Sequence, residues 1–166
     1  ETAARKIFNQ IKEFAKYAFN KSHAVAYSVL AFQTAYLKHY YMPEFMAALM
    51  TSFIGSSNKI TQYIVDCGRC GIKVIPPNVN ESLGRFYAKG KDIMYGLCAI
   101  KNVGANFVSN IVEEREKRGK FKNFNEFAMR LASKDLNKRA VESMVMGGAF
   151  DELAPRIPIL QTFEII

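Results

Sequence analysis

The chain has 166 residues, of which 49% are hydrophobic and 23% are charged, so it is long enough and apolar enough to fold around a buried core. Its formal net charge of +8 favours a polyanionic partner, because each neutralised phosphate releases counterions. The longest stretch without a charged residue, 22–37, is too short to cross a bilayer, so we expect no membrane partner.

Three cysteines form an odd and sparse set, which is typical of a reducing compartment rather than of a disulfide-linked secreted protein. No segment has the pattern of a signal peptide, and we expect a cytoplasmic protein. A helical pattern begins almost at Glu1 and apolar residues still accumulate at Ile166, so we expect a monomeric piece excised from a longer protein.

The first 71 residues predict a series of helices. Apolar residues recur at helical spacing in each of four segments, 3–18, 23–40, 43–50 and about 58–70. The second segment is apolar on nearly all sides, which predicts a helix buried on more than one face. Ser22 is a candidate N-cap for this helix, and Pro43 suits the start of the next one.

The pattern changes at Ile72. A short strand is expected over 72–75, and a β-hairpin over 85–95 with its turn at Gly90. Helical patterns return over 105–118, 124–131 and 137–146, with Asn123 as an N-cap. The sequence therefore predicts a mainly α fold with a small β insert (α+β), divided into segments 1–71, 72–100 and 101–166.

The turn before residue 105 predicts an anion site. Asn102 and Gly104 are residue types that accept positive φ, so the chain can reverse there. The first N–H groups of the helix that follows, from Gly104 to Phe107, have no partner within the helix and lie at the positive end of its dipole. With Lys101 beside them, these amides are suited to a nucleic-acid phosphate, although an αα-corner whose glycine serves packing alone gives the same pattern.

Positive charge gathers around this turn. Residues 101–139 contain ten Lys or Arg against five acids, which is five of the eight net charges in under a quarter of the chain. The densest run, 117–122, lies between two helix–turn–helix units, the second of which ends at Gly147 and Gly148. DNA-backbone contact is the interpretation we favour over a solubilising loop.

Other chemical motifs are weaker. Cys67 and Cys70 are expected in the last turn of a helix, where the dipole raises a thiol pKa, so neither a redox pair nor a zinc site is predicted. Lys21, Ser22 and His23 at a helix start could hold a phosphate, but a capped turn with solvated side chains is the simpler interpretation.

Several segments resemble the family of bacterial replicative DNA polymerase III alpha subunits. They are, in chain order, 17–27 (YAFNKSHAVAY), 33–38 (QTAYLK), 43–48 (PEFMAA), 71–80 (GIKVIPPNVN), 96–104 (GLCAIKNVG), 136–139 (LNKR) and 148–151 (GAFD). The resemblance covers nearly the whole chain in one collinear order.

The resemblance implies that residues 1–71 belong to the fingers region, with Lys21, Ser22 and His23 facing nucleotide or template. It implies that 101–166 is a tandem helix-hairpin-helix module that binds duplex DNA beside the sliding-clamp contact. The parent protein would be a DNA-directed DNA polymerase using two magnesium ions in its palm. No segment resembles the palm, so we expect no cofactor and no catalysis in this piece.

Two positions depart from the family pattern. The common hairpin has Gly where Asn102 stands, and Gln161-Thr162-Phe163 is a poor match to a clamp-binding peptide.

We expect the DNA backbone to be bound without sequence specificity by Lys101, Asn102, Val103, Gly104, Ala105, Asn106, Lys120, Lys122, Lys138, Arg139, Gly147 and Gly148. Two alternatives remain open: a protein-interaction module that docks the clamp or another replisome subunit, and a helix-hairpin-helix repair enzyme. For the latter, Asp135 is the nearest acid, but it follows Lys134 in an expected loop.

Overall fold

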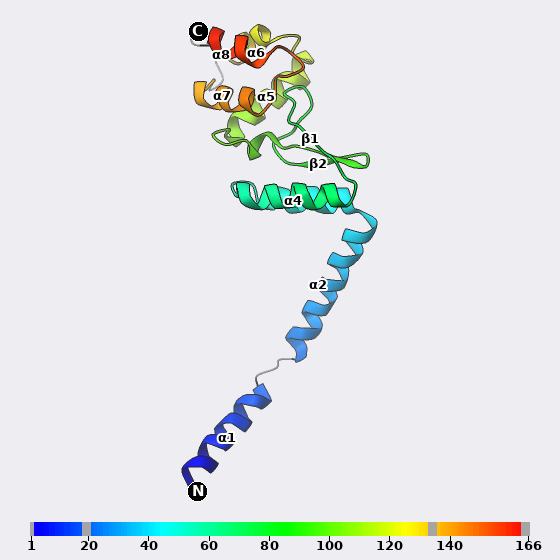
Figure 1. The fold of residues 1–166 in the computed structure, drawn as a ribbon, viewed down its shortest axis with the longest axis vertical. Coiled ribbons are helices and arrows are strands. Elements are labelled where there is room, and N and C mark those ends of the chain that lie inside the picture. The colour runs from blue at the N-terminus through cyan, green and yellow to red at the C-terminus, as the bar shows by residue number, and fades with distance from the viewer. Residues whose placement is uncertain (1, 18–20, 133–135, 164–166) are drawn as a thin grey trace. The chain divides into compact units, whose positions relative to one another are not determined.

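The computed structural model describes residues 2–17, 21–132 and 136–163. Its contacts divide the chain into two compact units, 1–41 and 42–166. Within these residues, eight α-helices, one 3₁₀ turn and three short strands make it mainly helical with one small sheet (Figure 1), which confirms the fold class expected from the sequence.

The first unit consists of helices α1 (Thr2–Tyr17) and α2 (Lys21–Tyr40). No residue of α2 is buried, so the expectation of a helix covered on more than one face is wrong for this chain. Apolar side chains such as Phe32, which is 71% exposed, lie at the surface of this unit. Because α2 already begins at Lys21, Ser22 lies inside its first turn and is not the N-cap.

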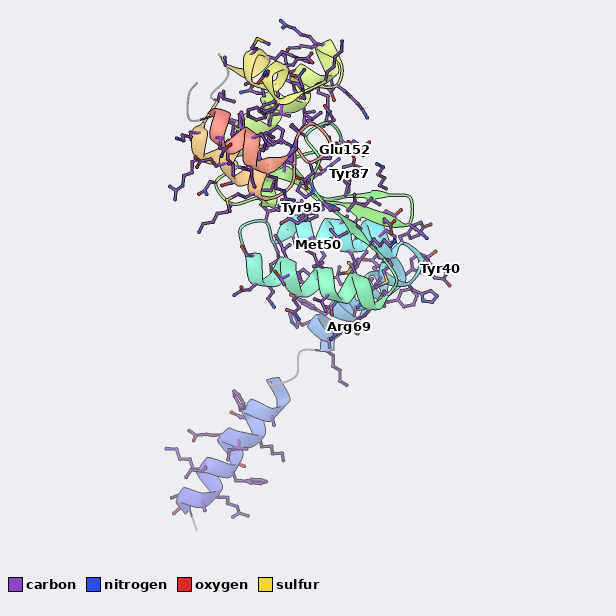
Figure 2. The ribbon with its side chains drawn as sticks, turned by 45° about the horizontal axis from the view of Figure 1, so that its top comes forward. Tyr40, Met50, Arg69, Tyr87, Tyr95 and Glu152 are labelled. Atoms are coloured by element: carbon purple, nitrogen blue, oxygen red, sulfur yellow. The ribbon has the colours of Figure 1, made fainter. Side chains whose placement is uncertain are left out.

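The second unit starts with two helices packed on a sheet. Helices α3 (Met42–Ser52) and α4 (Ser57–Arg69) contact strands β1 (Val74–Ile75), β2 (Tyr87–Lys89) and β3 (Asp92–Met94). The strand order is β1-β3-β2, with β3 parallel to β1 and antiparallel to β2. Met50, labelled in Figure 2, is fully buried in the core between helices and sheet. Residues 42–71, expected to belong with the first segment, therefore pack with the β insert.

The expected β-hairpin is confirmed. Strands β2 and β3 pair in the register Ala88 to Ile93, and Gly90 has the positive φ of 63° that the tight turn requires. The parallel pairing of β1 with β3 brings Val74 opposite Ile93. The sequence did not predict this second pairing.

The remaining elements are helical and surround a second core (Figure 1). They are the 3₁₀ turn η1 (Leu97–Ala99) and helices α5 (Ala105–Arg118), α6 (Phe124–Leu131), α7 (Lys138–Met146) and α8 (Arg156–Phe163). Aromatic rings dominate this core: Phe127 packs edge to face on Phe121 and Phe150, with centroid distances of 5.2 and 4.8 Å.

Side chains cap two of these helices at their starts; the sequence predicted the cap at Asn123 but not the one at Asn137. Asn123 accepts a hydrogen bond from the Glu126 amide at 2.9 Å, and Asn137 accepts one from the Arg139 amide at 2.9 Å. The Glu126 carboxylate in turn accepts a hydrogen bond from the Lys122 amide at 2.9 Å. In a standard capping box the N-cap amide makes this bond, and here the amide of the preceding residue makes it. These hydrogen bonds satisfy amides at the starts of α6 and α7.

Candidate nucleic-acid interface

The turn between η1 and α5 reverses at one left-handed residue. Asn102 has φ of 67° and is the non-glycine residue with positive φ in the described part of the chain. The Val103 amide donates to the Ile100 carbonyl at 3.2 Å and closes the turn. Gly104 has φ of −82° and ψ of 151°, so the expectation that it would also use left-handed backbone is wrong.

The N-terminus of α5 is open. Gly104 occupies the N-cap position, and among the described residues no side chain caps this helix. A Cβ built on Gly104 would have no atom within 4 Å, so neither packing nor backbone conformation requires a glycine there. What the missing side chain does provide is unobstructed access to the amides of Gly104, Ala105 and Asn106, at the positive end of a 14-residue helix.

Val103 differs from its neighbours. Its side chain is buried and its amide is already donated to Ile100. This geometry argues against the DNA contact expected from Val103 and makes it the anchor of the turn.

A hollow of about 510 Å³ lies beside the turn. Its lining combines two segments, 98–104 and the stretch around the start of α4 that includes Ile54, Gly55 and Ser57. Ser56 precedes α4 without capping it, so two uncapped helix starts border one hollow whose rim carries Lys101. This position of the α3–α4 loop could not be predicted from local sequence patterns, because Gly55 and Gly104 are 49 positions apart.

The positive residues expected to contact DNA fall into two groups. In the described part of the chain, no acid pairs with Lys101, Lys122 or Arg139. Lys120, by contrast, lies 3.6 Å from Glu81, although its side chain remains 68% exposed. An exposed pair of this kind contributes little to stability and leaves Lys120 able to exchange partners.

Other cations of the basic region serve the fold. The Arg115 guanidinium donates to the carbonyls of Val79 and Ser82, at 2.9 and 3.1 Å, and its burial lowers its pKa from the usual value. Arg130 is held by two carboxylates. The net positive charge of residues 101–139 is therefore a poor measure of what faces a partner.

Glu81 is an ion-pair partner of the basic region that the sequence did not reveal. It pairs with both Lys89 and Lys120, and its hydrogen bond to Lys89 is the main cause that holds the pKa of its carboxyl below the usual value. No short-range sequence pattern links Glu81 to these two lysines, so the pairs could not be predicted from the sequence.

The structure does not bring all expected contacts together. Lys120 and Lys122 follow the C-terminal end of α5, which is about 21 Å from its N-terminal amides at 1.5 Å per residue. Asn102, however, contacts α7: its Nδ2 donates to Ser143 Oγ at 3.1 Å. Arg139 lies one turn before Ser143 on that helix.

The second glycine turn offers no free amide. The amides of Gly147 and Gly148 donate to the carbonyls of Ser143 and Val145, at 2.9 and 3.0 Å, and they lie at the negative end of α7. Arg156 caps the same end by donating to Met146 at 3.0 Å. This geometry argues against the backbone contact expected from Gly147 and Gly148.

Lys21, Ser22 and His23 belong to the other unit. They lie in the first turn of α2, and the His23 ring packs on Tyr27 with centroids 4.3 Å apart. Their orientation toward nucleotide or template stays a prediction. Asp135, the acid considered for a repair enzyme, lies outside the described residues.

Cys67 has the environment of a structural residue, whereas Cys70 is exposed. Cys67 is buried, and burial is the main cause that raises the pKa of its thiol, followed by the charges of Cys70 and Asp66. A raised pKa keeps the thiol protonated, which is the opposite of a reactive cysteine. Within the described residues, no three His, Cys, Asp or Glu gather closely enough to hold a metal ion.

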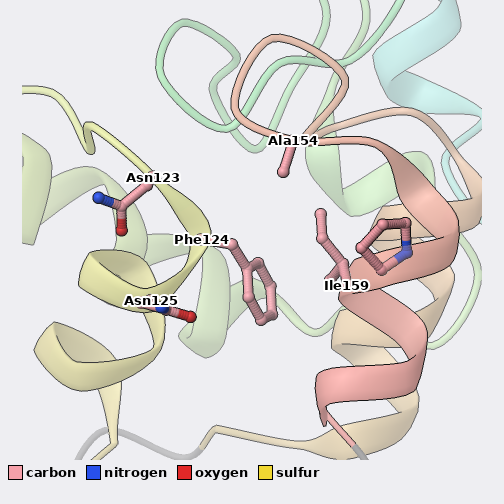
Figure 3. Close-up of a pocket in the computed structure, with 6 residues that line it drawn as sticks. Asn123, Phe124, Asn125, Ala154 and Ile159 are labelled. Atoms are coloured by element: carbon pink, nitrogen blue, oxygen red, sulfur yellow. The ribbon is translucent and has the colours of Figure 1, made fainter.

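A second hollow, of about 170 Å³, lies between the start of α6 and α8 (Figure 3). Phe124 and Ile159 face each other across it, and Asn123, Asn125, Ala154 and Pro158 complete its lining. All six residues are uncharged, so this hollow does not suit a phosphate.

Comparison with known proteins identifies the class to which this geometry belongs. A family model described as a helix-hairpin-helix motif matches residues 71–156, which include the turn before α5 and the pair of helices α5 and α6. The chain belongs to the helix-hairpin-helix family.

The chain is also similar to a segment of larger proteins. It is 46% identical over 99% of its length to DNA polymerase III subunit alpha of Thermus aquaticus, and 42% identical over 99% to that of Deinococcus radiodurans. The Escherichia coli K12 subunit is 41% identical over 92% of the chain. The chain spans only 12–13% of the length of these relatives. These similarities confirm the resemblance drawn from the sequence motifs.

Among the described residues, no helix combines the length and apolar character needed to cross a bilayer.

Proposed function

We propose that residues 42–166 bind the sugar-phosphate backbone of duplex DNA without reading its sequence. The observation that carries this proposal is the uncapped and unobstructed N-terminus of α5, with Lys101 beside it. Amides of Gly104, Ala105 and Asn106 would donate to one phosphate, and unpaired Lys101 and Arg139 would add charge. Membership of the helix-hairpin-helix family supports the same role.

The likeness to DNA polymerase III subunit alpha suggests where this binding is used. We propose that the parent protein is a cytoplasmic, template-directed DNA polymerase, and that this part holds primer–template duplex during replication. Contacts with a sliding clamp and other replisome subunits are part of the same proposal. Lys21, Ser22 and His23 would face nucleotide or template from the fingers region.

Two magnesium ions would serve the parent polymerase from a palm domain that this chain does not resemble. The described residues do not fit such a site, since they lack a suitable cluster of metal ligands. We propose that this part binds DNA and has no chemical step of its own.

A protein-interaction role has support in the apolar side chains that the first unit exposes. Helix α2 exposes many apolar side chains, among them Val25, Leu30 and Phe32, each more than half exposed. Such a surface is suited to contact with other protein elements. For residues 42–166, the open amides and unpaired cations favour DNA.

The test is a titration of the chain with two duplexes of unrelated sequence at about 50 and 200 mM salt, followed by fluorescence anisotropy. We expect equal affinities for both duplexes and a steep fall with salt. Gly104→Val should weaken binding roughly tenfold or more, because its branched side chain blocks charge-assisted hydrogen bonds from the amides.

Gly68→Val is the matched control. Gly68 is exposed, and a Cβ there also has no atom within 4 Å, so the same substitution is made far from the turn. Equal binding by the two variants, or an affinity that does not change with salt, would show that the α5 N-terminus does not bind phosphate.

A further inference from the structure

The residue at which this chain departs from the common hairpin pattern makes a specific contact. Asn102 Nδ2 donates to Ser143 Oγ at 3.1 Å, and Ser143 Oγ donates to the Arg139 carbonyl at 2.9 Å. Because the Ser143 proton is used within α7, a lone pair of its oxygen remains for Asn102. Glycine would satisfy the φ of 67° at this position but could not make the contact.

A second contact lies one helical turn away. A Cβ built on Gly147 would lie 3.5 Å from Ile100 Cδ1, so the Ile100 side chain packs where α7 lacks a side chain. Ile100 and Asn102 therefore contact Gly147 and Ser143, which are four residues apart on one face of α7.

The same face continues to Arg139, four residues before Ser143 and about 6 Å along the helix axis. The turn that carries Lys101 and Gly104 is thus docked on the face of α7 that carries an unpaired cation. Without the Asn102 contact, the turn would lose its side-chain hydrogen bond to this face of α7.

We propose that Asn102 is a positioning residue, whose amide holds the first hairpin turn on α7 so that the α5 amides and Arg139 engage one DNA backbone together. This inference rests on the proposed DNA-binding function. It assigns to Asn102 a role through Ser143 and Arg139 rather than a direct contact with phosphate.

The test compares Asn102→Gly, Ser143→Ala and the double variant of the full chain in duplex titrations over a range of salt. Each single substitution should weaken binding about fivefold, which corresponds to the loss of one hydrogen bond. The double variant should bind no more weakly than either single variant, because both remove the same contact. Ser143→Thr keeps the hydroxyl and should bind like the unmodified chain.

Arg139→Gln tests the positioning role through the salt dependence of DNA binding, which a purely structural role of Asn102 would not change. In the unmodified chain it should lower the slope of log K against log salt by about one. In the Asn102→Gly background the same substitution should change the slope by clearly less, because Arg139 is no longer aligned with the turn.

Gly104→Val separates the two proposals within the same titrations. If it binds as tightly as the unmodified chain, the proposed function fails. If it binds weakly while the losses from Asn102→Gly and Ser143→Ala add, or if Arg139→Gln has the same effect in both backgrounds, only the positioning role of Asn102 is overturned.

Discussion

Gly96 and Gly104 stand eight residues apart and have opposite structural requirements. A Cβ on Gly96 would lie 2.6 Å from the Arg85 carbonyl carbon and 2.8 Å from two further backbone atoms, whereas a Cβ on Gly104 meets nothing within 4 Å. Backbone atoms cannot rotate away as a flexible side chain can. Gly96 is therefore required by the fold, whereas packing does not require a glycine at position 104.

We predict that Gly96→Ala lowers the free energy of unfolding by about 2–3 kcal/mol, as expected when a group is forced into a packed region. Gly104→Ala, with φ of −82°, should change it by less than about 0.5 kcal/mol. Urea unfolding followed by circular dichroism measures both. Equal stability of the two alanine variants would contradict the close approach at Gly96.

At the scale of single residues, the sequence predicts the features that depend only on neighbouring residues. The cap at Asn123 follows from residue types three positions apart, and it is present. The contact between Asn102 and Ser143 spans 41 residues, and nothing local indicates it. The site was therefore predictable as a turn with open amides, but the residue that docks this turn on α7 was not.

At the scale of elements, one buried ion pair joins α5 to α6. Arg130 Nε lies 3.2 Å from Glu114 Oε1, with side chains 8% and 4% exposed, and its Nη2 donates to the carbonyls of Glu114 and Gly119. Its guanidinium carbon also lies 4.5 Å from the centroid of the Phe121 ring. These contacts fix the loop that carries Lys120 and Lys122.

Arg130→Met should destabilise the chain by about 3–5 kcal/mol, because it leaves the Glu114 carboxylate buried without its main partner. Arg118→Met is the matched control: Arg118 pairs with the same carboxylate oxygen at 3.2 Å, but its side chain is 68% exposed, so about 1 kcal/mol or less is expected. Thermal unfolding of the two variants measures the difference, and similar melting temperatures would show that burial does not decide the strength of these pairs.

Helical periodicity predicted α1, α3 and α5–α7 because each has an apolar face or a cap. The parallel pairing of β1 with β3 depends on how α4 returns the chain to the sheet, which periodicity does not encode. The apolar character of α2 predicted burial, yet the helix is exposed, because periodicity reports which residues can be buried and not whether a partner is present.

At the scale of the whole molecule, the sequence pattern changes at Ile72, but the boundary between the two packed units lies after residue 41. Met46, Met50 and Ile60 share one core with Phe86 and Ile93, so the helices before residue 72 and the strands after it form one unit. A change in secondary-structure pattern is therefore not a domain boundary in this chain.

Acid stability is a property of the whole second unit, because its carboxylates lie on different elements. Hydrogen bonds hold the pKa of Asp151 and of Glu81 below their ordinary values of 3.8 and 4.5, through Arg156 and Lys89 respectively. The Lys122 amide does the same for the pKa of Glu126. A carboxyl group whose pKa is lower in the folded state binds fewer protons there than when unfolded, so it stabilises the fold above its unfolded pKa, and that contribution is lost as pH falls through the folded pKa.

The free energy of unfolding should therefore stay nearly constant from about pH 7 to pH 5 and fall below about pH 4.5, where the unfolded chain begins to take up protons. Asp151→Asn removes one of the contributing groups and should make this fall shallower without changing its direction. Urea unfolding at several pH values measures the slope for both chains. A slope unchanged by Asp151→Asn would mean that the pair with Arg156 does not contribute, since only a group that titrates differently in the two states can make stability depend on pH.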